Sequence, residues 1–188
     1  MMLPRLLRPL HTLLTVSAST LLLLTGCTGA PKGSHPIPQL DITRYLGTWY
    51  EIARFDHRFE RGLECVTALY SLREDGRIKV INRGRNIHSG EWKEAEGKAF
   101  PLSIPADGRL KVSFFGPFYS GYNILVLDDD YRYALVAGPN HRYLWILSRT
   151  PTLDKAHYEA LVDTAQAQGF DTSALMRIPQ NEAPCTTL

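Results

Sequence analysis

The sequence predicts an all-β protein, an eight-stranded antiparallel up-and-down β-barrel with one C-terminal α-helix packed on its outside. Between residues 47 and 148, short segments alternate apolar and polar side chains, which is the pattern of a half-buried strand. Tight-turn dipeptides such as Asp75-Gly76 and Asp107-Gly108 separate these segments, and short connections favour antiparallel neighbours. Eight strands in this order tend to close into a barrel, because closure removes exposed edges, and such a barrel has room for one small ligand.

Residues 1–26 have the features of an export signal that is removed from the mature protein. Arg5 and Arg8 form a basic start, and the apolar run at 13–24 is too short to span a bilayer, which takes about 20 apolar residues. The run ends at Leu24-Thr25-Gly26-Cys27, which is similar to the lipobox of bacterial lipoproteins. The resemblance implies a lipid-anchored Cys27, and Thr28 after it points to the outer membrane. A plain secretory signal with a chance cysteine is the alternative.

Three parts are expected along the chain: the lipoprotein signal peptide (1–26), a tether (27–39) and one domain (40–188). The tether is expected because residues 30–39 are rich in Pro, Gly and polar side chains. The signal peptide contains two arginines and no acidic residue, so its removal from 21 Lys and Arg against 19 Asp and Glu leaves no net charge. That balance gives no electrostatic case for a nucleic-acid partner.

The eight strands are expected at residues 47–55, 64–72, 77–83, 89–100, 109–115, 121–128, 132–137 and 142–148. The fifth has the cleanest alternation, with Leu110, Val112 and Phe114 on one face and charged or polar residues on the other. The fourth is polar but contains a tryptophan, which is typical of an edge or a solvent-facing strand.

One helix is expected after the strands, with Thr152 as its N-cap and Gly169 as its stop. Tyr158, Leu161, Val162 and Ala165 form a single apolar stripe, so this helix is expected to lie against the outside of the barrel. A short helical turn is also expected at residues 41–46, with Asp41 as its cap.

Three cysteines occur, and the lipobox accounts for Cys27. In an exported protein the simplest pairing of the other two is a disulfide between Cys65 and Cys185, which would fasten the C-terminal tail to the body. A free, reactive Cys65 is the alternative.

Catalytic and metal-binding signatures are absent from the sequence, so we expect no catalytic residue, no metal site and no cofactor. His57, His88 and His141 fall in expected loops and are interpreted as surface residues. Glu51 is interpreted as either a surface carboxylate or the buried partner of an arginine.

The stretch Gly47-Thr48-Trp49-Tyr50 begins a resemblance to the lipocalin family, and in particular to bacterial lipocalins that are outer-membrane lipoproteins. Further matching stretches lie at 44–62, 111–119 and 143–151, and the resemblance covers residues 40–180. It implies that Arg149 packs on Trp49 at the closed end of the barrel in a cation–π contact, so that Gly47, Trp49 and Arg149 are structural. The family's second motif is reduced here to Asp130-Tyr131. Cys65 also matches the position from which some animal lipocalins bridge to their tail.

A ligand is expected in the open half of the barrel, since the family resemblance and the alternation direct a largely apolar set of side chains inward. The resemblance implies Trp145 and Tyr119, and strand alternation adds Tyr143, Phe55, Val80, Val112 and Phe114. Arg54, Asn82 or Tyr119 are the candidates for meeting a carboxylate or phosphate headgroup.

These features together predict a lipid-anchored lipocalin on the periplasmic face of the outer membrane. We expect it to bind fatty acids or lysophospholipids and to store, transport or scavenge them, without being an enzyme. Two alternatives stay open: an isomerase that uses Cys65, and a structural envelope protein whose barrel is filled by its own side chains. Pairing of two copies of the chain also stays open.

Overall fold

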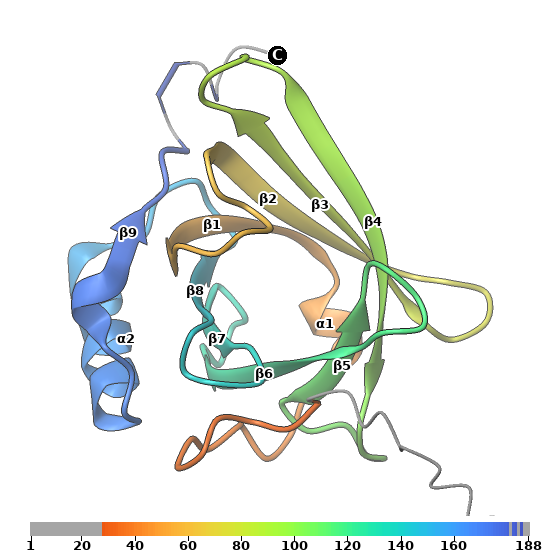
Figure 1. Ribbon diagram of the computed structural model, residues 1–188. Helices are drawn as coiled ribbons and strands as arrows, with labels where there is room; N and C mark the ends of the chain where they lie inside the picture. The colour runs from red at the N-terminus through yellow and green to blue at the C-terminus, as the bar shows by residue number, and fades with distance from the viewer. Residues whose placement is uncertain (1–27, 181, 184, 186–188) are drawn as a thin grey trace, which may run out of the picture.

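The computed structural model describes residues 28–180, 182, 183 and 185, so the expected signal peptide and Cys27 lie outside the described residues. Nine strands form one antiparallel sheet, and β1 to β8 close into a barrel because β1 pairs with both β8 and β2. Figure 1 shows the closed ring of strands, with α2 packed outside it. The predicted fold class is therefore confirmed.

The elements in chain order are α1 (Ile42–Tyr45), β1 (Gly47–Phe55), β2 (Leu63–Leu72), β3 (Ile78–Asn86), β4 (Trp92–Pro101), β5 (Arg109–Ser113), β6 (Ser120–Leu127), β7 (Tyr133–Ala137), β8 (Leu144–Ser148), α2 (Lys155–Ala167), a 3-10 turn η1 (Thr172–Ala174) and β9 (Leu175–Arg177). All eight predicted barrel strands are present, with their ends within three residues of the predicted ones. The short β9, which lies outside the ring on the edge of β1, was not predicted.

The two ends of the barrel differ. The connections at 56–62, 87–91, 114–119 and 138–143 lie at the end that we name the mouth, and those at 73–77, 102–108 and 128–132 lie at the end that we name the base. The helix α1 belongs to the base, because it leads directly into the first residue of β1.

Both helices begin at an aspartate. The carboxylate of Asp41 accepts hydrogen bonds from the backbone N–H groups of Thr43 and Arg44, at 2.9 and 3.3 Å, as the sequence predicts. For α2 the predicted cap is wrong, because Asp154 takes the role of Thr152 and accepts from the N–H of Ala156 at 2.8 Å. The carbonyl of Thr152 instead accepts hydrogen bonds from the hydroxyls of Ser148 and Thr150.

A β-bulge in β1 reverses the faces of this strand halfway along it. Glu51 pairs with Leu147 and Ala53 pairs with Ile146, so Ile52 is an extra residue in the ladder. Because side chains alternate with a period of two, one extra residue moves every later side chain to the opposite face. Beyond the bulge, Arg54 therefore faces the interior and Phe55 faces the outside, the reverse of their faces in an unbroken strand.

Two hydrophobic clusters follow from this arrangement. The inner one fills the base half of the barrel around Trp49, which is fully buried. The outer one lies between the barrel wall and α2, where Phe55 packs with Leu161 and Phe170. The predicted docking of the apolar stripe of α2 onto the outside of the barrel is confirmed by the burial of Leu161 and Ala165.

The stretch expected to be a tether lies along the outside of the barrel where it is described, from residue 28 to 39. The N–H of Ile37 donates to the carbonyl of Ile124 in β6, and the carbonyl of Ile37 accepts from Gly108. Near the start of the segment, the carbonyl of Gly29 accepts a hydrogen bond from the Asn123 side chain at 3.3 Å. Residues 28–39 are thus bonded to the wall at several points.

The C-terminal tail is fastened to the barrel by a disulfide and by hydrogen bonds. Cys65 and Cys185 form the predicted disulfide across 120 residues of sequence. The side-chain N–H₂ of Gln180 donates to the carbonyls of Glu51 and Val66, at 2.8 and 2.7 Å, at the bulges of β1 and β2. No helix among the described residues combines the length and apolar character that crossing a membrane requires.

Candidate functional site

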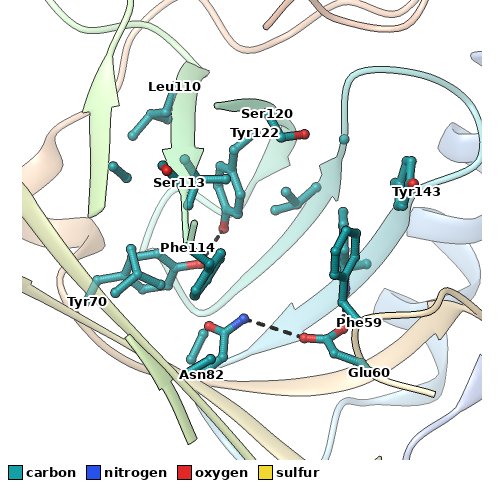
Figure 2. Close-up of a pocket in the computed structure, with 18 of the residues that line it drawn as sticks. Phe59, Glu60, Tyr70, Asn82, Leu110, Ser113, Phe114, Ser120, Tyr122 and Tyr143 are labelled. Carbon is teal, nitrogen blue, oxygen red and sulfur yellow. Dashed lines mark hydrogen bonds between the residues drawn. The ribbon is translucent and has the colours of Figure 1, made fainter. Parts of the chain in front are cut away.

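The barrel contains a cavity of about 740 Å³ that opens at the mouth. Figure 2 shows its wall, with Leu110 from β5, Phe114 just after β5, Tyr122 from β6 and Phe59 from the first mouth loop directed into it. The volume lies in the range of pockets that hold one small organic ligand, about 300–1,000 Å³. A barrel filled by its own side chains, one of the alternatives from the sequence, does not agree with this cavity.

The base of the cavity is closed by a tryptophan and an arginine. The Arg149 guanidinium lies 4.0 Å from the ring centroid of Trp49, which is the cation–π contact implied by the sequence. Arg149 also donates to the carbonyls of Arg44 and Thr48, at 2.7 and 3.0 Å, and thereby ties α1 to β1. At Gly47, whose φ is +97°, a Cβ would lie 3.2 Å from this guanidinium, so a glycine fits here. The three residues thus have the structural surroundings that the resemblance implies.

Three tyrosine hydroxyls form a chain above this base. Tyr45 and Tyr122 place their hydroxyl oxygens 2.6 Å apart, and Tyr70 donates to Tyr122 at 3.0 Å. Burial raises the pKa of all three phenols, so each keeps its proton and can serve as a donor. The deep end of the cavity is therefore neutral and largely apolar.

A buried carboxylate, Glu60, gives the mouth half of the cavity its strongest polar group. The indole N–H of Trp145 donates to Glu60 Oε2 at 3.1 Å, and the Asn82 amide donates to Oε1 at 3.5 Å, as the dashed line in Figure 2 shows. His57 Nε2 lies 3.0 Å from the same Oε2. Burial by itself would raise the pKa of Glu60, but His57, Trp145 and the charge of Arg54 together bring this pKa below its ordinary value.

A second buried carboxylate, Glu51, forms an ion pair with Arg54. Arg54 Nη1 donates to Glu51 Oε1 at 2.6 Å, and both side chains are almost completely buried. Burial and the negative charge of Glu60 raise the pKa of Glu51 well above its ordinary value despite this arginine. Of the two interpretations of Glu51, the buried partner of an arginine is confirmed.

The structure gathers most of the predicted ligand-binding residues around the cavity. Trp145, Tyr119, Tyr143, Val80, Val112, Phe114 and Asn82 line it. Strand alternation locates Val80 and Val112 correctly because β3 and β5 have no bulge at these positions.

Two predicted ligand-binding residues do not line the cavity. The prediction for Phe55 is wrong, because the bulge at Ile52 turns this ring outward against Phe170. Arg54 faces the interior but is not part of the cavity wall, and its guanidinium is held by Glu51 and by the carbonyls of Glu60 and Leu63. A bulge leaves no regular mark in the sequence, so alternation from Trp49 onward gives the wrong face for both residues.

The polar cluster at the mouth was not predicted from the sequence. His57 was interpreted as a surface residue but is only 6% exposed, because the first mouth loop folds it against Trp145 and Glu60. The sequence spacing of His57 and Glu60 does not predict their contact with β8, since a loop has no fixed side-chain period. Ser113 was also missed, and its buried hydroxyl has no hydrogen-bond partner among the described residues.

The wall of the cavity has a gap between β4 and β5. Only residues 98–101 of β4 pair with β5, whereas residues 92–99 pair with β3. The mouth half of β4 therefore has a free edge, and its residues 92–96 are exposed. Phe114 covers part of the gap, because its ring packs directly against the backbone of Gly97. A Cβ at Gly97 would lie only 2.8 Å from the nearest ring carbon of Phe114.

Neither a free thiol at Cys65 nor a cluster of metal ligands is found among the described residues. The sulfur of Cys65 is bonded to Cys185, so the isomerase alternative has no thiol to act as its nucleophile. Within residues 28–180, 182, 183 and 185, no group of three or more His, Cys, Asp or Glu is arranged to hold a metal ion.

Comparisons with known proteins agree with this geometry. A family model described as a lipocalin-like domain matches residues 40–180. The chain is 52% identical to outer membrane lipoprotein Blc of Escherichia coli over 169 residues, which cover 89% of this chain and 96% of that protein. It is 32% identical to apolipoprotein D of Bos taurus, covering 86% of this chain and 93% of that one. The solved structure of insecticyanin from Manduca sexta has the same fold, with a TM-score of 0.67 at 21% identity over 84% of this chain and 89% of that chain.

Proposed function

The chain belongs to the lipocalin family, and from this membership we propose that it is a lipid-anchored outer-membrane lipocalin that binds fatty acids or lysophospholipids. It would hold them for storage, transport or scavenging on the periplasmic face of the membrane. The name of the Escherichia coli relative supports the location, and the lipobox-like ending at Cys27 supports the anchor.

The observation that carries this proposal is the cavity of about 740 Å³, which is apolar at depth and polar near its mouth. An acyl chain inserted with its methyl end toward Tyr122 would meet Val80, Val112 and Leu110 along its length. Burial of an acyl chain contributes roughly 0.8 kcal/mol per CH₂ group. The headgroup would then remain near the mouth, where Asn82 and Tyr119 offer polar atoms.

The charges near the mouth favour a lysophospholipid over a free fatty acid. Arg54 is already paired with Glu51, so it does not serve as the cation for a ligand carboxylate. Glu60 holds a negative charge in the same part of the cavity, where it repels an anion and attracts an ammonium group. Arg58 and Lys93 also line the cavity near its mouth, so a zwitterionic headgroup suits these surroundings better than a carboxylate does: its ammonium group can meet Glu60 while its phosphate meets these cations.

The test is to purify the mature protein from membranes, extract it with organic solvent and identify the co-purified lipids by mass spectrometry. The delipidated protein should then take up a lysophospholipid that carries an ethanolamine headgroup more tightly than the fatty acid of the same chain length, measured by displacement of a fluorescent fatty acid. Failure to take up any long-chain amphiphile would refute the proposal. A preference for the fatty acid would refute only the argument from Glu60.

A further inference from the structure

The start of the described chain lies at the mouth of the barrel. The Gly29 carbonyl accepts from Asn123, whose amide also donates to the carbonyl of Gly138 at 3.0 Å, at the beginning of a mouth loop. A Cβ on Gly121, next to the first residue of β6, would lie 2.6 Å from the Gly29 oxygen. This contact holds the backbone of residues 28–29 against the outside of the wall at its mouth end.

From there the segment runs toward the base. Ile37 is bonded between Ile124 and Gly108, and the N–H of Leu40 donates to the carbonyl of Ala106 in a base connection. Consecutive Cα atoms are about 3.8 Å apart, so acyl chains on Cys27 would leave the protein beside the mouth. Because the chain is bonded to the barrel from Gly29 onward, few residues are left to form a flexible linker between the anchor and the barrel.

The rim around the mouth carries exposed aromatic side chains. Phe115 and Phe118, on the loop next to residues 28–29, are 71% and 70% exposed, and Phe59 on the first mouth loop is 57% exposed. Trp92 and Ile87, at the tip of the β3–β4 hairpin, are also exposed. Aromatic side chains with this exposure are typical of protein surfaces that lie in the interface of a membrane.

The charges at the two ends differ as well. At the base, Arg73 and Arg77 lie close to Asp75, and Arg109 and Arg132 form ion pairs with Asp107 and Asp128. Arg44 and Arg149, also at the base, donate to backbone carbonyls. At the mouth, Arg61 and Arg85 are paired with Asp56 and Glu64, whereas Arg58, Lys93 and Arg142, which lie in or beside the mouth loops, have no carboxylate within 4.0 Å among the residues that the structure describes. Unpaired cations beside exposed aromatic rings match the phosphates of a phospholipid surface.

We propose that the mouth of the barrel docks on the phospholipid leaflet that holds the acyl chains of Cys27, with Phe115 and Phe118 in its interfacial region. This inference rests on the lipid anchor of the proposed function. A ligand would then pass between the leaflet and the cavity without crossing bulk water. The base faces away from the membrane: its large exposed apolar side chains in the described part of the chain, Leu72, Leu102 and Ile104, are aliphatic and none is aromatic.

The test uses the full mature protein in vesicles of phosphatidylethanolamine and phosphatidylglycerol. Phe118→Cys and Ile104→Cys each add one thiol to a chain whose other cysteines are acylated or in the disulfide, and each is labelled with a small fluorophore. Phospholipids with a spin label on the acyl chain quench only fluorophores that reach the bilayer. The label at residue 118 should lose most of its emission and the label at residue 104 should keep it.

Equal quenching at both positions, stronger quenching at residue 104, or no quenching at either would overturn the proposal. Shielding of residue 118 that occurs only at a high protein-to-lipid ratio would identify a second copy of the chain as the occupant of the mouth, and would also overturn it. The labels report docking without any ligand, so a failure of lipid binding in detergent is distinguished from a failure of docking. Mass spectrometry that finds no acyl chain on Cys27 would overturn both the anchor and the docking.

Discussion

Glu60 is the residue on which the mouth half of the cavity is organised. Its carboxylate receives Trp145 from β8 and Asn82 from β3, and it lies 3.0 Å from His57 of its own loop. One side chain thus links two strands and the first mouth loop. Because Trp145 and Asn82 both donate to its oxygens, these contacts are strongest when the carboxyl group is ionised.

We therefore expect the stability of the protein to depend on Glu60 at acid pH. A carboxyl whose pKa is lower in the folded state stabilises the fold above its unfolded value, here near 4.5, and this contribution is lost as the pH falls through the folded pKa. The free energy of unfolding, measured by urea titration at decreasing pH, should fall less steeply below this value for Glu60→Gln than for the wild type. Glu94→Gln, at an exposed position, should keep the wild-type slope. Parallel slopes for all three proteins would contradict this role of Glu60.

Single residues also show where the sequence is informative. Val80, Val112 and Trp145 were assigned to the correct face because regular strands determine faces by their period of two. Trp49 and Arg149 were assigned by the family resemblance, and their contact is confirmed. His57 and Glu60 lie in a loop, where burial depends on the tertiary packing of strands that are distant in sequence.

At the scale of the element, the bulge in β1 lets one strand contribute to both hydrophobic clusters. Before Ile52 its inward residues close the base, and after Ile52 its outward residues support α2. A strand without the bulge would place Phe55 in the cavity and Arg54 against the helix. The sequence-based prediction made this error for Phe55 because it assumed an unbroken alternation, whereas Arg54 was predicted to meet the ligand headgroup and is instead held by Glu51.

Phe55→Ala should therefore destabilise the protein without changing ligand affinity. Removal of a buried phenylalanine typically costs about 3–5 kcal/mol, and Phe55 is 5% exposed in the outer cluster. Phe114→Ala, in the cavity wall, should instead weaken ligand binding and cost less stability, because its ring is only half-buried. Urea unfolding and fluorescence displacement on both variants test this. A loss of affinity in Phe55→Ala with unchanged stability would show that Phe55 faces the ligand.

The C-terminal tail is the second element whose attachment can be tested. Replacing Cys65 and Cys185 together by serine should lower the free energy of unfolding by roughly 2–4 kcal/mol, the usual contribution of a disulfide. Reduction of the disulfide in the wild type should lower its free energy of unfolding by a similar amount. Thiol titration of the unfolded, unreduced protein with Cys27 acylated should find no free thiol, and two free thiols would contradict the bridge.

At the scale of the whole molecule, the barrel is a container, and a small side chain such as Ala68 in its wall leaves room for the ligand. Ala68→Phe would project a ring into the cavity, so we expect it to shift the preferred ligand toward shorter acyl chains while the fold is kept. The matched control is Leu69→Phe, one residue further along β2, where the native side chain is exposed on the outside. Displacement assays with a series of chain lengths measure the shift. The same chain-length preference in both variants would mean that the acyl chain does not reach β2.

The eight-stranded barrel and its outer helix were predictable from the sequence because the strands alternate and are joined by short turns, and the helix carries one apolar stripe. The cavity was predictable in outline for the same reason. The gap between β4 and β5 and the packing of residues 28–39 were not, because both depend on how far a strand continues beyond its partner.

That gap has a consequence for the breadth of cargo. Along residues 92–97, β4 is hydrogen-bonded to β3 but not to β5, and the ring of Phe114 packs on Gly97 in the space between β4 and β5. On this side the entrance is bounded by one side chain and not by a pair of hydrogen-bonded strands. The girth of what can enter here therefore depends on the size of residue 114, which a substitution can change without breaking any strand pairing.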